Sequence, residues 1–194
     1  LDNDIGTSEA GRVDPFSWQS RWHKSGLFDM ERRCLKVTFD QVRGVLEVVQ
    51  GYFNHNEQII RSVWQYDFCH PGRVDVSATV KVDRSVPSLP RVGAGLRLKG
   101  VPESVGWFGR GPHENYPDRK LSADFGRWEL PVDDMHTPYI FPSDNGLRCD
   151  VSELNLGAIK VTGDFQFAVS RYGTDQLMAA KHTHELEQQD GVFL

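Results

Sequence analysis

The sequence predicts an all-β fold, a large antiparallel β-sandwich with one or two short helices. The clearest observation is the strict alternation of apolar and polar residues over Val74–Val82, which is typical of a strand with one buried and one solvated face. Similar apolar runs recur at intervals of roughly ten to fifteen residues, with turn residues between them. No segment between the runs is long enough for the helical crossover that parallel strands need, so the strands should pair antiparallel.

The first expected element is a short helix that begins at Asp14-Pro15 and ends before Gly26. Aspartate can cap the free amides of a first turn, and proline suits the first helical position because its φ is already fixed. Trp18 and Trp22 lie four residues apart and therefore share one helix face. We expect both indoles to pack on the sandwich.

The remaining elements follow from the same period of two. Apolar alternation and intervening turn signals predict strands at Cys34–Phe39, Val45–Val49, Ile59–Phe68, Val74–Val82, Val92–Leu98, Leu156–Val161 and Phe165–Val169. The last two strands should be joined by a turn at Gly163-Asp164, and Thr174 or Asp175 should cap a short helix over Gln176–Ala180.

The stretch Val105–Arg148 differs from the rest of the chain in its composition. It holds five prolines and seven aromatic residues: Pro112, Pro117, Pro131, Pro138, Pro142, Trp107, Phe108, Tyr116, Phe125, Trp128, Tyr139 and Phe141. Proline fixes φ and lacks a backbone donor, so we expect neither a long helix nor a central strand across this stretch. Aromatic rings bury large areas, which predicts an ordered loop system that is packed against a sheet.

Composition excludes several classes of protein. With 39% hydrophobic and 25% charged residues, the chain resembles a globular domain with a substantial core, and no apolar run approaches the roughly 18 residues of a membrane span. A formal charge of -5 and the lack of a basic cluster argue against nucleic acid as a partner. Cys34, Cys69 and Cys149 are widely spaced, which predicts reduced thiols in or near a core and favours a cytoplasmic location.

Two runs within the aromatic stretch resemble a known family. The chain is similar to the C-terminal β-sandwich domain of bacterial β-galactosidases of glycoside hydrolase family 2. The residues that match are Gly111, Pro112, Glu114, Asn115, Tyr116, Pro117, Asp118 and Arg119 in the first run, and Thr137, Pro138, Tyr139, Pro142, Asn145, Gly146, Leu147 and Arg148 in the second. The resemblance includes residues 1–6 and 163–172, whereas His136 and Asp144 stand where the family usually has Tyr and often Glu.

The resemblance implies a fold and a domain organisation. The fold would be a galactose-mutarotase-like supersandwich, and residues 1–194 would form a single domain that is truncated at both ends of a longer chain. The catalytic glutamates of the family belong to a preceding TIM-barrel domain, so this chain alone should be inactive. Its expected partners are the other domains of the parent enzyme and further copies in a homo-oligomer.

The resemblance also implies a function for the whole enzyme, the hydrolysis of terminal β-D-galactosides such as lactose. The sandwich would support the catalytic barrel, and a loop near its beginning would contribute Gly6, Ser8, Glu9 and Arg12 to the rim of the active site. No cofactor is expected in this chain, and any Mg²⁺ or Na⁺ of the parent enzyme would lie in domains outside it.

The carboxylates of this chain suggest turns more than catalysis. Glycoside hydrolysis needs two carboxyl groups on either side of the scissile bond. The candidates here lie in a stretch rich in Pro, Gly and Asn, where capping a turn or forming a salt bridge is the common role: Glu114, Asp118, Glu129, Asp133, Asp134 and Asp144.

Sugar contact remains an open alternative for the loop system. Aromatic faces and planar polar groups hold sugars, and the loops contain Asn115, Arg119, Trp128, Tyr139 and Arg148, which could instead order the loops. A free-standing carbohydrate-binding module would use such residues. An aldose-1-epimerase-like enzyme would use a histidine and a glutamate, for which His113-Glu114 or His136 are candidates.

A metal site is not predicted. His182 and His184 on an extended segment would project to the same side, but zinc needs a third and usually a fourth ligand. Glu185 and Glu187 are too close in sequence to complete such a site.

Overall fold

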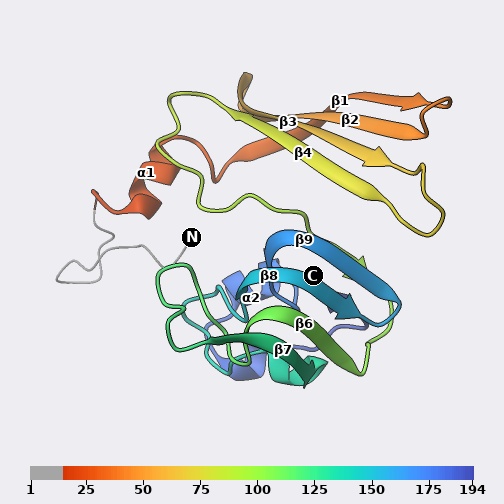
Figure 1. The fold of residues 1–194 in the computed structure, drawn as a ribbon. Helices are drawn as coiled ribbons and strands as arrows, with labels where there is room; N and C mark the ends of the chain where they lie inside the picture. Colours follow the sequence, from red (N-terminus) through yellow and green to blue (C-terminus); the bar gives the residue numbers. More distant parts are fainter. Residues whose placement is uncertain (1–14) are drawn as a thin grey trace. The chain divides into compact units, whose positions relative to one another are not determined.

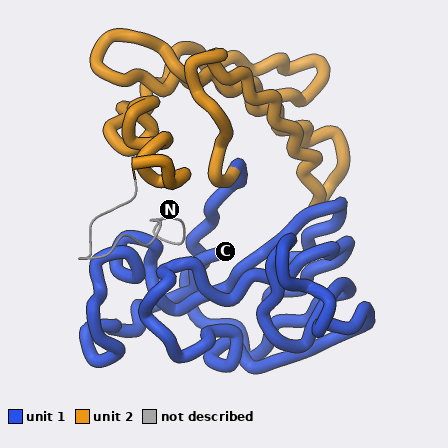
Figure 2. The backbone as a smooth tube through the Cα atoms, turned by 90° about the vertical axis from the view of Figure 1, so that its left-hand side faces the viewer, with its two compact units in different colours: residues 1–3, 92–194 blue, residues 4–91 orange. Residues whose placement is uncertain are grey.

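The computed structural model describes residues 15–194, and within these residues the chain divides into two compact units between Arg91 and Val92. Figure 2 colours the two units, which are described separately below. In the described residues the chain is mostly antiparallel strand with two short α-helices, so the predicted all-β, sandwich-like class is confirmed. None of the helices in this part of the chain has the length and apolarity needed to cross a membrane.

Unit 2 contains helix α1 (Trp18–Lys24) and a four-stranded antiparallel sheet in the order β1-β2-β3-β4 (Figure 1). Its strands are β1 (Met30–Asp40), β2 (Val45–Asn54), β3 (Glu57–Asp67) and β4 (Asp75–Val82). The N-cap of α1 is Ser17, whose hydroxyl accepts a hydrogen bond from the Ser20 amide at 3.2 Å. The helix therefore begins at Trp18 and not at Pro15 as predicted, while the predicted cap Asp14 lies outside the described residues.

The indoles of α1 have different environments. Trp22 is buried and its Nε1 donates to Ser88 Oγ at 3.2 Å, as expected for a packed indole. Trp18 stacks on Trp22 with 6.0 Å between ring centroids but remains exposed, so the expectation that both tryptophans are packed holds only for Trp22.

The sheet of unit 2 has an apolar face of which only one end is covered. Ile59, Ile60 and Val86 form a small core there, against which Leu27, Met30, Tyr52, Val80 and Leu89 pack. At the other end, antiparallel register aligns two apolar rows, Phe39-Leu46-Tyr66-Val76 and Val37-Val48-Trp64-Ala78. We call these eight residues the open face. Val37, Phe39 and Val76 are each more than half exposed. The prediction of a buried face along Val74–Val82 is wrong, because of its five apolar residues only Val80 is even half-buried.

Unit 1 is built on a four-stranded antiparallel sheet in the order β7-β6-β8-β9 (Figure 1). Its strands are β6 (Ser104–Gly111), β7 (Asp124–Pro131), β8 (Arg148–Leu156) and β9 (Ile159–Phe167). A two-stranded sheet pairs β5 (Arg97–Leu98) with β10 (Val192–Phe193). The strand expected over Val92–Leu98 is thus confined to its last two residues.

The core of unit 1 lies on one face of the four-stranded sheet. Val105, Trp107, Leu154 and Leu156 from β6 and β8 are almost completely buried. They pack with Val151 of β8 and with further residues from β5, β9, β10 and the connecting segments: Leu98, Val132, Met135, Phe167, Val169, Val192 and Leu194.

The expectation that Val105–Arg148 contains no central strand is wrong. β6 lies between β7 and β8, and its residues alternate between buried and half-buried positions. Glycines conceal this pattern, because Gly109 and Gly111 occupy buried positions without contributing apolar side chains. They are needed there: a Cβ on Gly109 would lie 2.7 Å from Val151 Cγ2. The prolines lie outside β6, and Pro131 ends the edge strand β7, where a missing donor is tolerated.

The segments after β6 differ from the predictions in detail. β8 and β9 are joined at Gly157, which has φ of +59°, whereas the predicted turn residue Gly163 lies inside β9. Helix α2 (Thr174–Ala179) begins after Gly173 without a side-chain cap, so neither Thr174 nor Asp175 is its N-cap. The short 3₁₀ turns are η2 (Val132–Met135) and η3 (Thr183–Glu185).

The cysteines are free thiols. Cys149 is buried, but Cys34 and Cys69 are exposed, so the expectation of thiols in or near a core holds only for Cys149.

Candidate functional site

The loops that follow β6 and precede β8 meet around the carboxylate of Glu114. The two strands are antiparallel neighbours, so the last residues of β6 and the first residues of β8 lie at the same end of the sheet. The Tyr139 hydroxyl lies 2.8 Å from each oxygen of Glu114, and the Gly146 amide donates to Oε2 at 2.9 Å. The Glu114 side chain is only 11% exposed. This carboxylate therefore joins the two runs on which the family resemblance depends.

Tyr116 and Arg119 complete the surroundings of Glu114. The Tyr116 hydroxyl lies 3.3 Å from Oε2, and Arg119 Nη2 lies 3.3 Å from Oε1. The Arg119 guanidinium also stacks over the Tyr116 ring at 4.5 Å. Burial, together with the hydrogen bond to Tyr139 and the charge of Glu114, raises the pKa of the Tyr116 phenol above its usual range. The hydroxyl consequently stays protonated as a donor.

Asn115 is completely buried and serves the backbone of the loops. Its Nδ2 donates to the His113 carbonyl at 3.1 Å, and its Oδ1 accepts from the Cys149 amide at 3.0 Å. Its own amide donates to the Leu147 carbonyl at 2.8 Å. These contacts fix the first loop against the start of β8.

Arg148 is buried and holds three carbonyl groups. Its Nη1 donates to Met135 and Gly146 at 3.2 and 2.8 Å, and its Nη2 donates to Pro112 at 3.1 Å. The guanidinium lies 5.5 Å from the centre of the Trp107 ring. Burial lowers the pKa of Arg148 to about 10. Within residues 15–194 its Nε has no hydrogen-bond partner.

Trp128 lies on the edge strand β7 and is half-buried. It is paired in register with Trp107, and its Nε1 donates to the Gly109 carbonyl at 3.1 Å. The structure thus brings Asn115, Arg119, Tyr139 and Arg148 together in loop-ordering contacts, while Trp128 packs within the sheet.

The histidines considered for acid-base chemistry lie on different loops. His113 is exposed, and its Nε2 lies 3.1 Å from Ser122 Oγ. His136 is half-buried and packs edge-on against Tyr172, with 4.9 Å between ring centroids. Burial lowers the pKa of His136, and within the described residues its Nδ1 has no hydrogen-bond partner.

An ion cluster near the start of β8 was not predicted. The Asp150 carboxylate pairs with Arg110 Nε at 2.6 Å and with Lys120 Nζ at 2.8 Å. These cations lie 40 and 30 residues away in sequence. Only the pairing of β6 with β8 and the fold of the first loop bring them together, so no local sequence signal could have indicated the cluster.

Other candidate carboxylates also contact protein groups. Glu129 accepts a hydrogen bond from the Ser104 hydroxyl, and Asp133 lies 3.4 Å from Arg171 Nη1. The predicted rim residues Gly6, Ser8, Glu9 and Arg12 lie outside the described residues.

The protein is thus an all-β protein of antiparallel sheets, with two loops that are joined by hydrogen bonds to Glu114. This is the class of protein that the family-2 resemblance implies. Comparison with known proteins makes this specific. The family model described as "Beta galactosidase small chain" matches residues 1–194. The chain therefore belongs to the β-galactosidase small chain family.

Individual relatives agree with the family model. A β-galactosidase of Yersinia enterocolitica is 46% identical over 196 aligned residues, which cover 100% of this chain and 19% of that protein. A β-galactosidase of Yersinia pseudotuberculosis is 44% identical, with 100% of this chain and 18% of that protein covered. The chain spans less than a fifth of the length of these relatives.

Proposed function

We propose that this chain is a non-catalytic domain of a β-galactosidase that hydrolyses terminal β-D-galactosides such as lactose. The observation that carries the proposal is the match over the full chain to proteins named β-galactosidase, of which it spans only 18–19%. A domain of this size within an enzyme roughly five times longer is well suited to support a catalytic domain.

The state of Glu114 supports a structural role. A glycosidase acid or nucleophile must face the substrate, with a second carboxyl group roughly 5 to 9 Å away. Both oxygens of Glu114 instead accept hydrogen bonds from protein donors, and the side chain is almost covered. Its hydrogen bonds hold two loops together, which is a structural role.

The open face supports contact with other parts of the parent enzyme. Monomeric proteins rarely expose large contiguous apolar patches, and such patches commonly mark interaction sites. We assign this face to packing within the parent β-galactosidase polypeptide, because unit 2 by itself leaves these apolar rows uncovered.

Three further parts of the proposal rest on the family resemblance and on composition. They are an active-site rim contribution from Gly6, Ser8, Glu9 and Arg12, participation in homo-oligomer contacts, and a cytoplasmic location, with which the free thiols are compatible.

A chromogenic β-galactoside separates the parts of the proposal. The isolated chain should not hydrolyse it, whereas the full-length enzyme that contains the chain should. In that enzyme, Val37→Lys on the open face should lower thermal stability and activity together. The matched control is Thr38→Lys, the next residue of β1 on the opposite face, where a lysine would lie opposite Glu47 and should lower neither. Robust hydrolysis by the isolated chain, or equal effects of the two substitutions, would contradict the proposal.

Within residues 15–194 the Nδ1 of His136 has no hydrogen-bond partner, and this observation favours an aldose-epimerase activity as the second candidate. Polarimetry on freshly dissolved galactose tests it: acceleration by the isolated chain that His136→Ala abolishes would support the epimerase. Saturable galactoside binding in calorimetry without turnover would instead favour a carbohydrate-binding module. We expect neither result.

A further inference from the structure

The segment between α2 and β10 forms a tight turn. Residues Thr183–Glu185 form η3, with His182 immediately before it. The amides of Glu185 and Leu186 donate to the carbonyls of His182 and Thr183, each at 3.1 Å. The extended backbone expected for His182-x-His184 is therefore wrong, and the difference matters because a 3₁₀ turn brings residues three apart to the same side.

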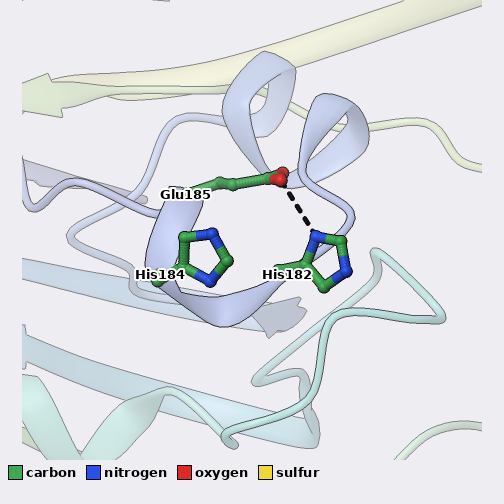
Figure 3. Close-up of side chains that lie close together, drawn as sticks. All are labelled: His182, His184 and Glu185. Carbon is green, nitrogen blue, oxygen red and sulfur yellow. Dashed lines mark hydrogen bonds and ion pairs between the residues drawn. The ribbon is translucent and has the colours of Figure 1, made fainter.

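The turn places two imidazoles and a carboxylate next to one another (Figure 3). His182 Nδ1 lies 3.0 Å from Glu185 Oε1, and the rings of His182 and His184 stack with 5.4 Å between centroids and an interplanar angle of 19°. One potential ligand atom from each of His182, His184 and Glu185 lies within 4.8 Å of the other two. All three side chains are exposed, so an ion could reach them from solvent.

We propose that His182, His184 and Glu185 form a binding site for a divalent transition-metal ion of the Zn²⁺ type. Two imidazole nitrogens and a carboxylate oxygen form a ligand set that zinc uses, with the fourth position left for water.

The distances fit this geometry after small side-chain rotations. With metal-ligand bonds of about 2.0–2.1 Å, tetrahedral angles separate the ligand atoms by roughly 3.3 to 3.4 Å. The His182-Glu185 separation of 3.0 Å is already close to that value, whereas an atom pair at the 4.8 Å limit must approach by about 1.4 Å. Exposed side chains can make such a change by rotation about χ angles.

The carboxylate is held in position by the backbone. Glu185 Oε2 accepts a hydrogen bond from the Lys181 amide at 2.7 Å, which leaves Oε1 directed to His182. Outer hydrogen bonds that orient a ligand are a regular feature of metal sites.

The chemistry of the ligands selects the ion. Imidazole suits Zn²⁺, Cu²⁺ and Ni²⁺, whereas Mg²⁺ and Ca²⁺ prefer sets made only of oxygen. In the absence of metal, the same residues form an exposed His182-Glu185 ion pair, which by itself contributes little stability.

The test is isothermal titration of ZnCl₂ into the chelator-treated full chain, with X-ray anomalous scattering at the zinc edge to locate the ion. We expect one Zn²⁺ at His182, His184 and Glu185, and no comparable heat with MgCl₂. His182→Ala or His184→Ala should abolish this binding event, and Glu185→Gln should weaken it by at least about tenfold. His70→Ala, which changes an exposed histidine elsewhere in the chain, should leave it intact.

Thermal unfolding of each variant without metal shows whether the fold is retained, and the exposure of the three side chains predicts that it is. The proposal is overturned if the native chain shows no anomalous peak at the turn. It is also overturned if the His182→Ala and His184→Ala variants bind Zn²⁺ as the native chain does.

Discussion

Tyr139→Phe tests the central claim about the loops, that Glu114 joins them through hydrogen bonds. The substitution keeps the ring and removes only the hydroxyl, which lies 2.8 Å from both carboxylate oxygens. A hydrogen bond to a charged group contributes about 1.5–3 kcal/mol. Glu114 would keep its bonds from Gly146, Tyr116 and Arg119, so no buried charge is left unpaired and the loss should lie near the lower limit.

We therefore expect Tyr139→Phe to lower the free energy of unfolding of unit 1 by about 1.5–2 kcal/mol, which reduces the folded-to-unfolded ratio by roughly 10- to 30-fold. Urea titration of the chain at pH 7 measures this change. Tyr172→Phe is the matched control in the same unit, because the contact of Tyr172 is through its ring against His136.

A double-mutant cycle with Glu114→Gln adds a second criterion. The neutral amide weakens the partner of the hydroxyl, so Tyr139→Phe should cost less in that background. Hydrogen exchange of the Gly146 amide should rise in Tyr139→Phe, because this amide donates to the same carboxylate. The reasoning is refuted if Tyr139→Phe costs less than about 0.5 kcal/mol or costs the same with Gln at position 114.

Three further predictions concern packing and charge in unit 1. Leu154→Ala should cost about 2–5 kcal/mol in urea unfolding, whereas Leu121→Ala at a 97% exposed position should stay within about 0.5 kcal/mol. Gly109→Ala should lower the free energy of unfolding by about 1–3 kcal/mol, because the added Cβ would overlap β8. Gly93→Ala should leave it unchanged, because there is open space around Gly93. Equal unfolding midpoints of the two variants would contradict this. Hydrogen bonds from Lys120 and Arg110 favour the ionised form of Asp150 and lower its pKa in the folded state. Asp150→Asn should therefore remove a stabilisation that is present above the ordinary aspartate pKa of about 3.9 and is lost as the pH falls through the lowered folded-state pKa. A difference in unfolding free energy between the two proteins that stays constant from pH 7 to 2 would refute this.

The sequence by itself determined the fold class and the four strands of unit 2. The alternation over Val74–Val82 and the apolar runs over Cys34–Phe39, Val45–Val49 and Ile59–Phe68 predict these strands, because side chains of a strand point alternately to opposite faces. The family resemblance could also be read directly, since the runs that carry it are continuous in sequence.

The local sequence pattern gave wrong predictions for strand β6 and for the start of helix α1. β6 was missed because Gly109 and Gly111 fill buried positions with no apolar side chain. Glycine is required at these positions because a Cβ would collide with β8 or with Trp107 and Trp128, and only the tertiary structure shows these neighbours. The helix start was misplaced because Ser17 is as suitable a cap in sequence as Asp14-Pro15, and in the described residues the Ser17 hydroxyl accepts the hydrogen bond from the Ser20 amide.

The contacts of the loops were decided by tertiary structure alone. A carboxylate such as Glu114 or Asp150 carries the same sequence signal whether it caps a turn, pairs with a distant cation or faces solvent. Its role depends on which residues the sheet register brings within about 3 Å, and hydrogen bonds form only over such distances. The same holds for His182 and Glu185, whose proximity depends on a 3₁₀ turn rather than on an extended backbone.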